Sequence, residues 1–355
     1  MAHLRVGLIG CGTIATSAHV PALQRLRSMV RVLRVCDIRQ EAAQAVAGSL
    51  GCVWSTEYRE LLDDGEIDAV VITTPEFLHA EQAIAAAQAG KHVLCEKPMA
   101  RTLREADGMI AAARDAGVQL MIAHSRRFTE RYRRAHALVR DGAVGSVVLV
   151  RENERRARAA PASTRVPTSG WRPDPDKATT WYTQARYAVG TVFHIGVHEM
   201  DLMRWFADSD ARLVSMESKI VDPHGEVPDT VAIQVSFDNG ALGVCDIYTQ
   251  APSGYPNHHE FEVFGTQGML RSRDFDSLAL TAFESAGMRF PTAAESLLLV
   301  RDAYALEQKL FFEAISSGTP VPLDPRDSRA ALEMAIAAVQ SSANGRPVSL
   351  PLVAA

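Results

Sequence analysis

The first 125 residues alternate between short apolar runs and longer segments with helical spacing. Short apolar runs are typical of strands that are buried on both faces, and apolar residues three and four apart predict helices. The expected strands are residues 4–10, 32–37, 69–73, 93–95 and 119–123, and the expected helices are residues 14–26, 41–50, 79–89 and 103–116. Regular alternation of strand and helix predicts a parallel, doubly wound sheet.

Glycine and proline mark the expected ends and breaks of these helices. Gly51, Gly90 and Gly117 follow three of them, where a left-handed residue closes a helix. Pro21 lies inside residues 14–26 and is expected to kink or reset that helix.

The second half of the chain has a different pattern. Residues 145–154 turn to extended sequence, and residues 155–180 are irregular, as in a loop over a site. Gly240 after Asn239 predicts a hairpin turn. The remaining expected elements are a helix at 197–206, strands at 213–221, 230–237, 241–248 and 260–264, and helices at 302–316 and 326–341. We therefore expect an open antiparallel or mixed sheet, with a Rossmann domain at 1–125 and an α+β domain at 126–355.

Composition narrows the class of protein. The 355 residues carry a net charge of −5 without a long run of one sign, which argues against nucleic acid or an anionic membrane as the main partner. No apolar stretch approaches the ~20 residues that span a bilayer, and the N-terminus lacks the pattern of a signal peptide. The five cysteines are scattered and form no CxxC pair, so we expect reduced thiols in a cytoplasmic protein.

The strongest motif is Gly10-Cys11-Gly12-Thr13-Ile14-Ala15, which follows a strand and opens a helix. In such a motif the first glycine allows a tight turn, the second lets backbone amides approach a pyrophosphate, and the small last residue lets the helix pack closely. The helix N-terminus adds unpaired N–H groups and partial positive charge. These features predict a dinucleotide site.

Two residues at the end of the second expected strand bear on the choice of dinucleotide. Asp37 stands where an acidic residue meets the ribose hydroxyls, and its charge would repel a 2′-phosphate. Arg39 could instead stack on adenine or neutralise a 2′-phosphate. NAD is the expected cofactor, and NADP is the alternative.

Residues 90–99, which read GKHVLCEKPM, resemble the EKP segment of the Gfo/Idh/MocA family of sugar and cyclitol dehydrogenases. Further segments resemble this family in the right order, and the likeness covers nearly the whole chain. They are Thr73-Thr74-Pro75 with His79, residues 123–128, the WRPDP run at 171–175, residues 194–201 and residues 262–268.

The resemblance implies a cis Lys97–Pro98 bond and a C-terminal domain whose sheet often forms the subunit contact. We therefore expect a homodimer or homotetramer, with a C-terminal helix that could pack back on the Rossmann domain. Together with the glycine motif, the resemblance gives the expected cofactor contacts: Gly10, Gly12, Thr13, Ile14, Asp37, Arg39, Thr73, Thr74, Pro75, His79, Glu96 and Lys97.

Hydride transfer between an alcohol carbon and nicotinamide needs a group that exchanges the hydroxyl proton. Lys97 is suited to place positive charge beside the developing alkoxide, although it could be a solvated surface lysine. His198 is the candidate acid or base, although it could be a core histidine. Asp201 could orient His198 or form a local cap.

His194 departs from the family pattern, which usually has Asp there. Lys97, His194 and His198 cannot all be cationic in a tight pocket, because like charges lower one another's pKa. We expect at least one neutral histidine and a more electropositive site, suited to a substrate with carboxylate or phosphate. Alternatively, His194 is only a hydrogen-bonding group. A metal on the two histidines lacks a third ligand, so no metal is expected.

The candidate substrate residues are Arg127, Trp171 and Arg172, which suit sugar stacking and anion contact or, alternatively, packing. Tyr182 and Tyr187 lie in a long link, 179–189, that could form a lid. The expected function is an NAD(P)-dependent dehydrogenase or reductase of a sugar, cyclitol or sugar derivative. The alternatives are a redox-neutral, NAD-retaining glycosidase-type enzyme of the same fold and a non-catalytic dinucleotide and sugar sensor.

Overall fold

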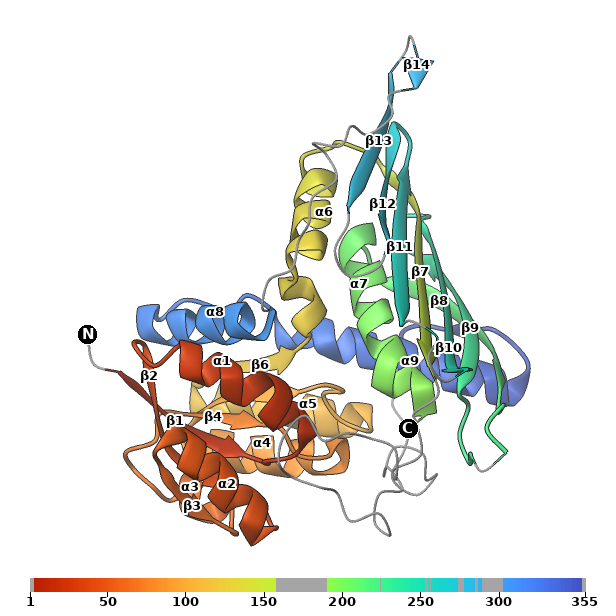
Figure 1. Ribbon diagram of the computed structural model, residues 1–355. Helices are drawn as coiled ribbons and strands as arrows, with labels where there is room; N and C mark the ends of the chain where they lie inside the picture. The colour runs from red at the N-terminus through yellow and green to blue at the C-terminus, as the bar shows by residue number, and fades with distance from the viewer. Residues whose placement is uncertain are drawn as a thin grey trace. The chain divides into compact units, whose positions relative to one another are not determined.

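The computed structural model describes residues 3–157, 190–223, 225–252, 255, 257–273, 278–284, 287–288 and 303–352. Contacts between residues divide the chain into two units. Of the described residues, 3–125 and 303–329 form the first unit and the others form the second (Figure 1).

The first unit contains a six-stranded sheet in which every strand pair is parallel. Its order is β3-β2-β1-β4-β5-β6, which is the doubly wound arrangement expected from the sequence. The strands are β1 (Leu4–Ile9), β2 (Val30–Cys36), β3 (Val53–Ser55), β4 (Ala69–Ile72), β5 (His92–Glu96) and β6 (Leu120–Ala123).

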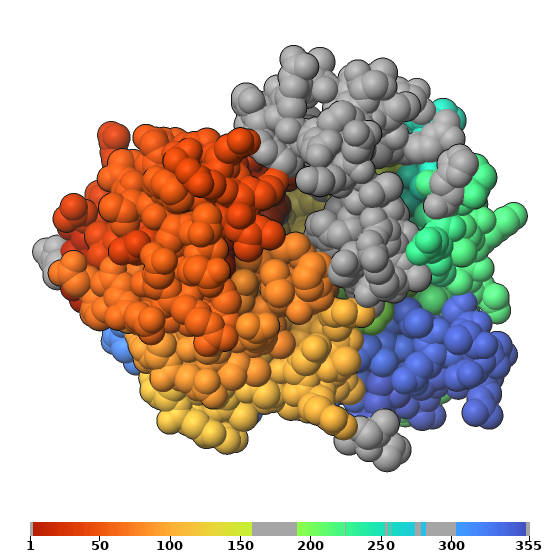
Figure 2. Space-filling model, turned by 90° about the horizontal axis from the view of Figure 1, so that it is seen from below, coloured from red at the N-terminus to blue at the C-terminus, as the bar shows by residue number. Residues whose placement is uncertain are grey.

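Helices accompany these strands in the expected order. They are α1 (Val20–Arg25), α2 (Gln40–Leu50), α3 (Arg59–Leu62), α4 (His79–Gln88), α5 (Leu103–Ala116) and α8 (Ala303–Ser317). In Figure 2 the residues of the N-terminal part, drawn red to orange, form a closely packed body. All four residues of β4 are buried, as a central strand between two helical layers requires.

The helix boundaries follow the punctuation in the sequence. Gly51 and Gly117 close α2 and α5 in the left-handed conformation, and Gly90 also has a positive φ of 74°. The helix expected at 14–26 is split into a π-helical turn, η1 (Ala15–His19), and α1, which has Pro21 in its first turn. The backbone nevertheless stays helical from Thr13 to Arg25, and His19 and Val20 both have right-handed helical angles, so the reset predicted at Pro21 is not seen. The irregularity of this helix is the π-helical turn that precedes the proline.

The helix α8 comes from the C-terminal part of the chain but belongs to the first unit. Its Gln308 side chain lies 2.9 Å from Nδ1 of His19, and the Tyr304 ring packs edge-on against the same imidazole at 5.2 Å. The first unit is therefore built from two separate parts of the sequence.

The second unit contains a nine-stranded sheet of order β14-β13-β12-β11-β7-β10-β9-β8-β15. Strands β7 and β10 are parallel and every other pair is antiparallel, which confirms the mostly antiparallel sheet. The strands are β7 (Val147–Ala157), β8 (Ala211–Lys219), β9 (Thr230–Phe237), β10 (Leu242–Ala251), β11 (His258–Gly265), β12 (Gly268–Arg273), β13 (Ala279–Glu284), β14 (Gly287–Met288) and β15 (Val348–Ser349).

One face of this sheet is covered by helix. Val231, Ile233, Val235 and Phe237 of β9 are buried, while the residues between them are more exposed. The covering helices include α6 (Glu130–Arg140) and α7 (Val197–Ala207) (Figure 1). The π-helical turn η6 (Val192–Gly196) leads directly into α7, and α9 (Pro325–Asn344) is the last α-helix along the described chain. Gly240 forms the β9–β10 turn with a φ of 88°, as predicted. Among the described residues, no helix is long and apolar enough to span a bilayer.

Candidate active site

The turn after β1 contains two glycines, Gly10 and Gly12, and a side chain would have a different effect at each. Gly10 has a φ of 98°, and a Cβ built on it would lie 2.8 Å from the backbone of Thr73. The Thr73 hydroxyl donates to the carbonyl oxygen of Gly10 at 2.7 Å, so the exits of β1 and β4 touch. A Cβ on Gly12 would meet no described atom within 4 Å. The protein itself does not need a glycine there, so the open space fits a ligand that approaches the backbone.

The N-terminus of the following helix borders this open space. Thr16 makes an early helical bond by donating its N–H to the carbonyl oxygen of Gly12 at 3.0 Å. The N–H groups of Thr13 and Ile14 come before that bond, where helices leave donors for a ligand. This arrangement fits the pyrophosphate of a dinucleotide.

Asp37 connects the glycine turn to the exit of β2. Its carboxylate accepts the backbone N–H of Cys11 at 2.8 Å and the backbone N–H of Arg39 at 2.9 Å. The Arg39 guanidinium donates to both oxygens of the same carboxylate, at 3.0 and 3.2 Å. Arg39 is therefore neutralised by the acid that was expected to select NAD.

His79 links the loop after β4 to the turn after β5. One ring nitrogen lies 2.8 Å from the carbonyl oxygen of Pro98 and the other 2.9 Å from that of Thr74. Burial lowers the pKa of His79, against the effect of these two carbonyl groups. A neutral ring has one N–H and donates to one of the two oxygens, whereas the imidazolium donates to both. The side chain is 1% exposed, so we assign it to hold Thr73-Thr74-Pro75 against the Lys97–Pro98 turn, whose peptide bond is cis as the resemblance implied.

Glu96 ends β5 and fixes the backbone of the residue that follows. One carboxylate oxygen accepts from Nε2 of His19 at 2.8 Å, and the other accepts the backbone N–H of Lys97 at 3.0 Å. Burial would raise the pKa of Glu96, but the hydrogen bond and charge of His19 and the charge of Lys97 lower it, so the group is a carboxylate. Lys97 itself is half-buried at the carboxyl end of β5.

The two candidate histidines of the second unit follow one another by four residues. His194 lies in the turn η6 and is half-buried, and His198 lies in the first turn of α7 and is 8% exposed. Asp201, on the same helix, accepts two bonds from Arg127 at 2.6 and 2.7 Å. Arg127 also lies over the Trp205 ring at 5.1 Å. Arg127 is therefore paired with an acid that the sequence offered as a partner for His198.

Beneath α7 lies a buried ionic cluster that the sequence reasoning did not find. Arg126 donates to Glu199 of α7 and, at 2.5 Å, to Glu154 of β7. Glu152 of β7, Glu199 and His259 of β11 bring three ligand atoms within 4.8 Å of one another, as a metal site would.

The guanidinium groups already occupy this cluster. Nη1 of Arg126 lies 3.0 Å from Nε2 of His259, and Arg131 contacts Nδ1 of the same ring. Burial and the charge of Glu199 raise the pKa of Glu152, which favours a protonated acid there. The cluster is balanced by arginine, so it does not fit a cation.

Several sequence expectations concern residues outside this description, and others were missed. Trp171, Arg172, Tyr182 and Tyr187 lie outside the described residues. His19 and Gln308 were missed because they are 289 residues apart in the sequence and no local pattern connects them.

Two family models match the chain. Residues 4–124 match the Gfo/Idh/MocA oxidoreductase family with its NAD-binding Rossmann fold, and residues 132–271 match the Gfo/Idh/MocA C-terminal domain.

Individual relatives match along the whole chain. The uncharacterized oxidoreductase YrbE of Bacillus subtilis (strain 168) is 31% identical over 97% of this chain and 96% of its own. The myo-inositol 2-dehydrogenase of Thermotoga maritima is 28% identical over 98% of both chains. The solved structure of levoglucosan dehydrogenase in complex with NADH has a TM-score of 0.85 at 26% identity and covers 99% of this chain and 100% of its own. The chain therefore belongs to the Gfo/Idh/MocA family of oxidoreductases, and its first unit is that family's NAD-binding Rossmann fold.

Proposed function

We propose that this oxidoreductase transfers a hydride between NAD and a secondary alcohol or ketone of a sugar, cyclitol or sugar derivative. The observation that carries the proposal is the support built around Lys97. The Glu96 carboxylate accepts the backbone N–H of Lys97, and the His79 ring contacts the carbonyl oxygen of Pro98. Both contacts lie at the carboxyl end of the parallel strands, where the glycine turn also lies. The names of two relatives, a myo-inositol 2-dehydrogenase and a levoglucosan dehydrogenase, support a polyhydroxylated substrate.

The first unit offers a set of groups for the cofactor. The backbone N–H groups of Gly12, Thr13 and Ile14 would hold the pyrophosphate, and Asp37 would accept the adenosine ribose hydroxyls. The bound nicotinamide supplies a hydride acceptor for alcohol oxidation. NAD is favoured over NADP because the Asp37 carboxylate would repel a 2′-phosphate and pairs with Arg39.

In the proposed reaction, the Lys97 ammonium donates a hydrogen bond to the reacting oxygen and stabilises the alkoxide that develops there. His198 takes the hydroxyl proton during oxidation and returns it during reduction, with His194 as a relay. Because Asp201 neutralises Arg127, the two histidines rather than that arginine would attract an acidic substrate. Sugar acids and phosphorylated polyols therefore belong among the substrates to be tested.

A substrate screen tests the proposal. Sugars, cyclitols and their acids are offered with NAD, and formation of free NADH is measured for the wild type, Lys97→Ala and the surface control Lys309→Ala. We expect NADH with at least one substrate, a loss of roughly 10²- to 10³-fold in kcat for Lys97→Ala because a charge that stabilises the transition state is removed, and no loss for Lys309→Ala. Substrate conversion without net NADH would instead support the glycosidase-type alternative. Tight sugar binding without any turnover would support the sensor.

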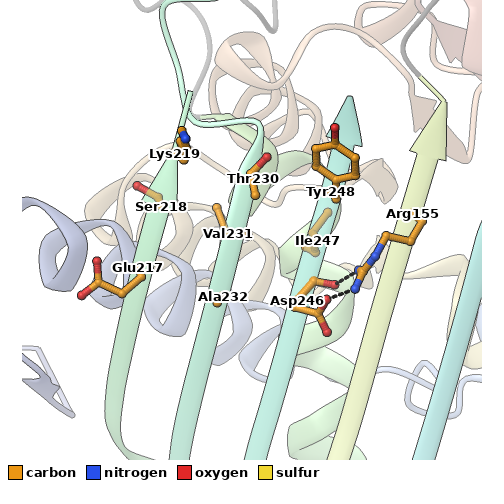
Figure 3. A pocket seen from close by; sticks show the side chains of 10 residues that line it. All are labelled: Arg155, Glu217, Ser218, Lys219, Thr230, Val231, Ala232, Asp246, Ile247 and Tyr248. Carbon is orange, nitrogen blue, oxygen red and sulfur yellow. Dashed lines mark hydrogen bonds and ion pairs between the residues drawn. The ribbon is translucent and has the colours of Figure 1, made fainter. Parts of the chain in front are cut away.

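We also propose a cytoplasmic homodimer or homotetramer that associates through the uncovered face of the nine-stranded sheet. Figure 3 shows a shallow pocket on this sheet, with Ala232 and Tyr248 among its lining residues and Arg155 paired to Asp246. A sheet with one covered face leaves a flat surface that a second copy can bury. Light scattering after size exclusion tests this: we expect Ala232→Arg to lower the measured mass to that of a monomer, and an unchanged oligomer would exclude this face. The five free cysteines accord with a reducing compartment.

A further inference from the structure

Glu76 is a buried acid that the proposed reaction does not use. It begins the short helix η2 (Glu76–Leu78), directly after Pro75, and its side chain is 5% exposed. Its Oε2 atom is buried and has no hydrogen-bond partner among the described residues. A buried carboxylate without enough partners is costly, so this group calls for an explanation.

The surroundings of Glu76 place its pKa near neutral pH. Burial raises the pKa of Glu76 to about 7, although its own backbone N–H and the positive charges of Lys97 and Arg101 act to lower it. Two other ionisable groups belong to the adjoining elements. His79 of α4 has a pKa that burial lowers, and the Glu96 carboxylate carries a negative charge that is bonded to His19 and to the Lys97 N–H. A modest change in local charge therefore decides whether Glu76 is ionised at neutral pH.

The position of Glu76 indicates that a bound cofactor could supply this change in local charge. Glu76 lies three residues after Thr73, whose hydroxyl is bonded to Gly10. The positive charge of Lys97 acts to lower the pKa of Glu76, so the two side chains interact electrostatically. Ligands bind at this carboxyl end of a parallel sheet. The nicotinamide ring carries a positive charge when oxidised and none when reduced, so a nearby carboxyl group distinguishes the two forms by charge alone.

We propose that Glu76 senses the oxidation state of the cofactor: it gives up its proton to solvent when NAD⁺ binds and keeps that proton when NADH binds. This inference rests on the proposed function, since it requires the nicotinamide to lie near Lys97. Glu76 exchanges no proton with the substrate. Its negative charge favours binding of the oxidised cofactor. No bond other than the O–H bond of Glu76 is broken in this step.

Calorimetry can count the proton directly. NAD⁺ and NADH are titrated separately into the full-length protein at pH 6.5, in two buffers with different heats of ionisation. We expect NAD⁺ to release roughly half a proton or more per site and NADH to release none, because only the charged ring lowers the pKa of the acid. The NAD⁺ affinity should also rise about fivefold or more between pH 6 and pH 8, whereas the NADH affinity should change little.

Two variants assign the proton. In Glu76→Gln we expect no proton release with either cofactor and roughly tenfold weaker binding of NAD⁺ relative to NADH at pH 8, because the carboxylate is gone. Glu57→Gln, an exposed acid of the same unit, should behave as the wild type.

The outcomes separate this inference from the proposed function. Equal proton release with both cofactors, or release that persists in Glu76→Gln, overturns the role of Glu76 and leaves the NAD site intact. Failure of the wild type to bind either cofactor overturns both. If Glu76→Gln does not fold, the difference between NAD⁺ and NADH in the wild type still decides, since its absence refutes the proposal.

Discussion

The carboxylate of Asp37 holds the guanidinium of Arg39 through bonds of 3.0 and 3.2 Å while it also accepts the backbone N–H of Cys11. One acid thus anchors the glycine turn and neutralises Arg39, the cation that the sequence suggested for a 2′-phosphate. Cofactor choice depends on this pair, because Arg39 can serve a phosphate only when Asp37 no longer competes for it.

Asp37→Asn is expected to shift the preference from NAD toward NADP. The amide still accepts the Cys11 N–H, but it no longer repels a phosphate or holds Arg39 by charge. We expect NAD binding to weaken and NADP binding to strengthen, each by roughly tenfold, the size of one charge-assisted hydrogen bond. Dissociation constants from NADH and NADPH fluorescence measure the ratio. The double variant Asp37→Asn, Arg39→Ala should lose the gain for NADP, and an unchanged ratio would show that the pair does not select the cofactor.

His79→Ala is expected to damage catalysis more than cofactor binding. The variant removes the side chain that lies between the carbonyl groups of Thr74 and Pro98, and with it the ring N–H that donates there. We expect a stability loss of about 1–3 kcal/mol and a fall in kcat that exceeds the change in NAD affinity, since the turn that carries Lys97 is no longer held. Urea denaturation and steady-state kinetics measure the two effects. His3→Ala, at an exposed position, serves as the control, and a normal kcat in His79→Ala would disprove the positioning role.

Local pattern predicted the parts of this protein that depend on neighbours in sequence. The parallel sheet, the glycine turn and the helix ends at Gly51 and Gly117 follow from periodicity and from residues with special backbone preferences. The short elements β3 and α3 were missed because three or four residues show no period. The helix α6 was also missed, since its face is rich in arginine and its buried Arg131 looks like a solvent residue until its partners are known.

The candidate site was predicted in the same uneven way. Lys97 was found through its motif, but its supports were not, because the Glu96–His19–Gln308 chain joins residues from three distant segments. Pairing also changed the expected roles: Arg127 and Asp201 were considered separately, and the structure joins them through two bonds. Long-range charge pairing leaves no period in the sequence, so only the fold reveals it.

Glu307→Gln is expected to stabilise the protein at neutral and alkaline pH. Both carboxyl oxygens of Glu307 are buried without a partner among the described residues, and burial, with the charge of Glu96, raises its pKa well above 4.5. The unfolded chain ionises this acid above its ordinary pKa while the folded protein keeps it protonated, so stability falls as pH rises from about 5. One such proton contributes about 1.4 kcal/mol per pH unit.

Denaturation of the wild type and Glu307→Gln between pH 5 and pH 8 measures this contribution. The wild-type slope should be steeper than that of the variant by the equivalent of up to one proton, while Glu152, whose pKa is also raised, keeps some slope in both. Glu313→Gln is the control, since Glu313 is a half-exposed acid on the same helix that pairs with Lys309 at 3.6 Å. Parallel curves for wild type and Glu307→Gln would mean that Glu307 is ionised in the folded protein.

Alanine at the two glycines of the first turn is expected to separate folding from cofactor binding. At Gly12 the new Cβ meets no described atom within 4 Å and the backbone has no positive φ, so Gly12→Ala should keep the wild-type melting temperature. It should nevertheless weaken NAD binding by roughly tenfold or more, because the methyl group stands where the backbone must approach a pyrophosphate. At Gly10 the new Cβ would lie 2.8 Å from backbone atoms of Thr73 at a φ of 98°, so Gly10→Ala should cost about 2 kcal/mol or more of stability. Thermal melts with and without NAD compare the two variants. If NAD stabilises Gly12→Ala as strongly as the wild type, the pyrophosphate does not bind at this turn.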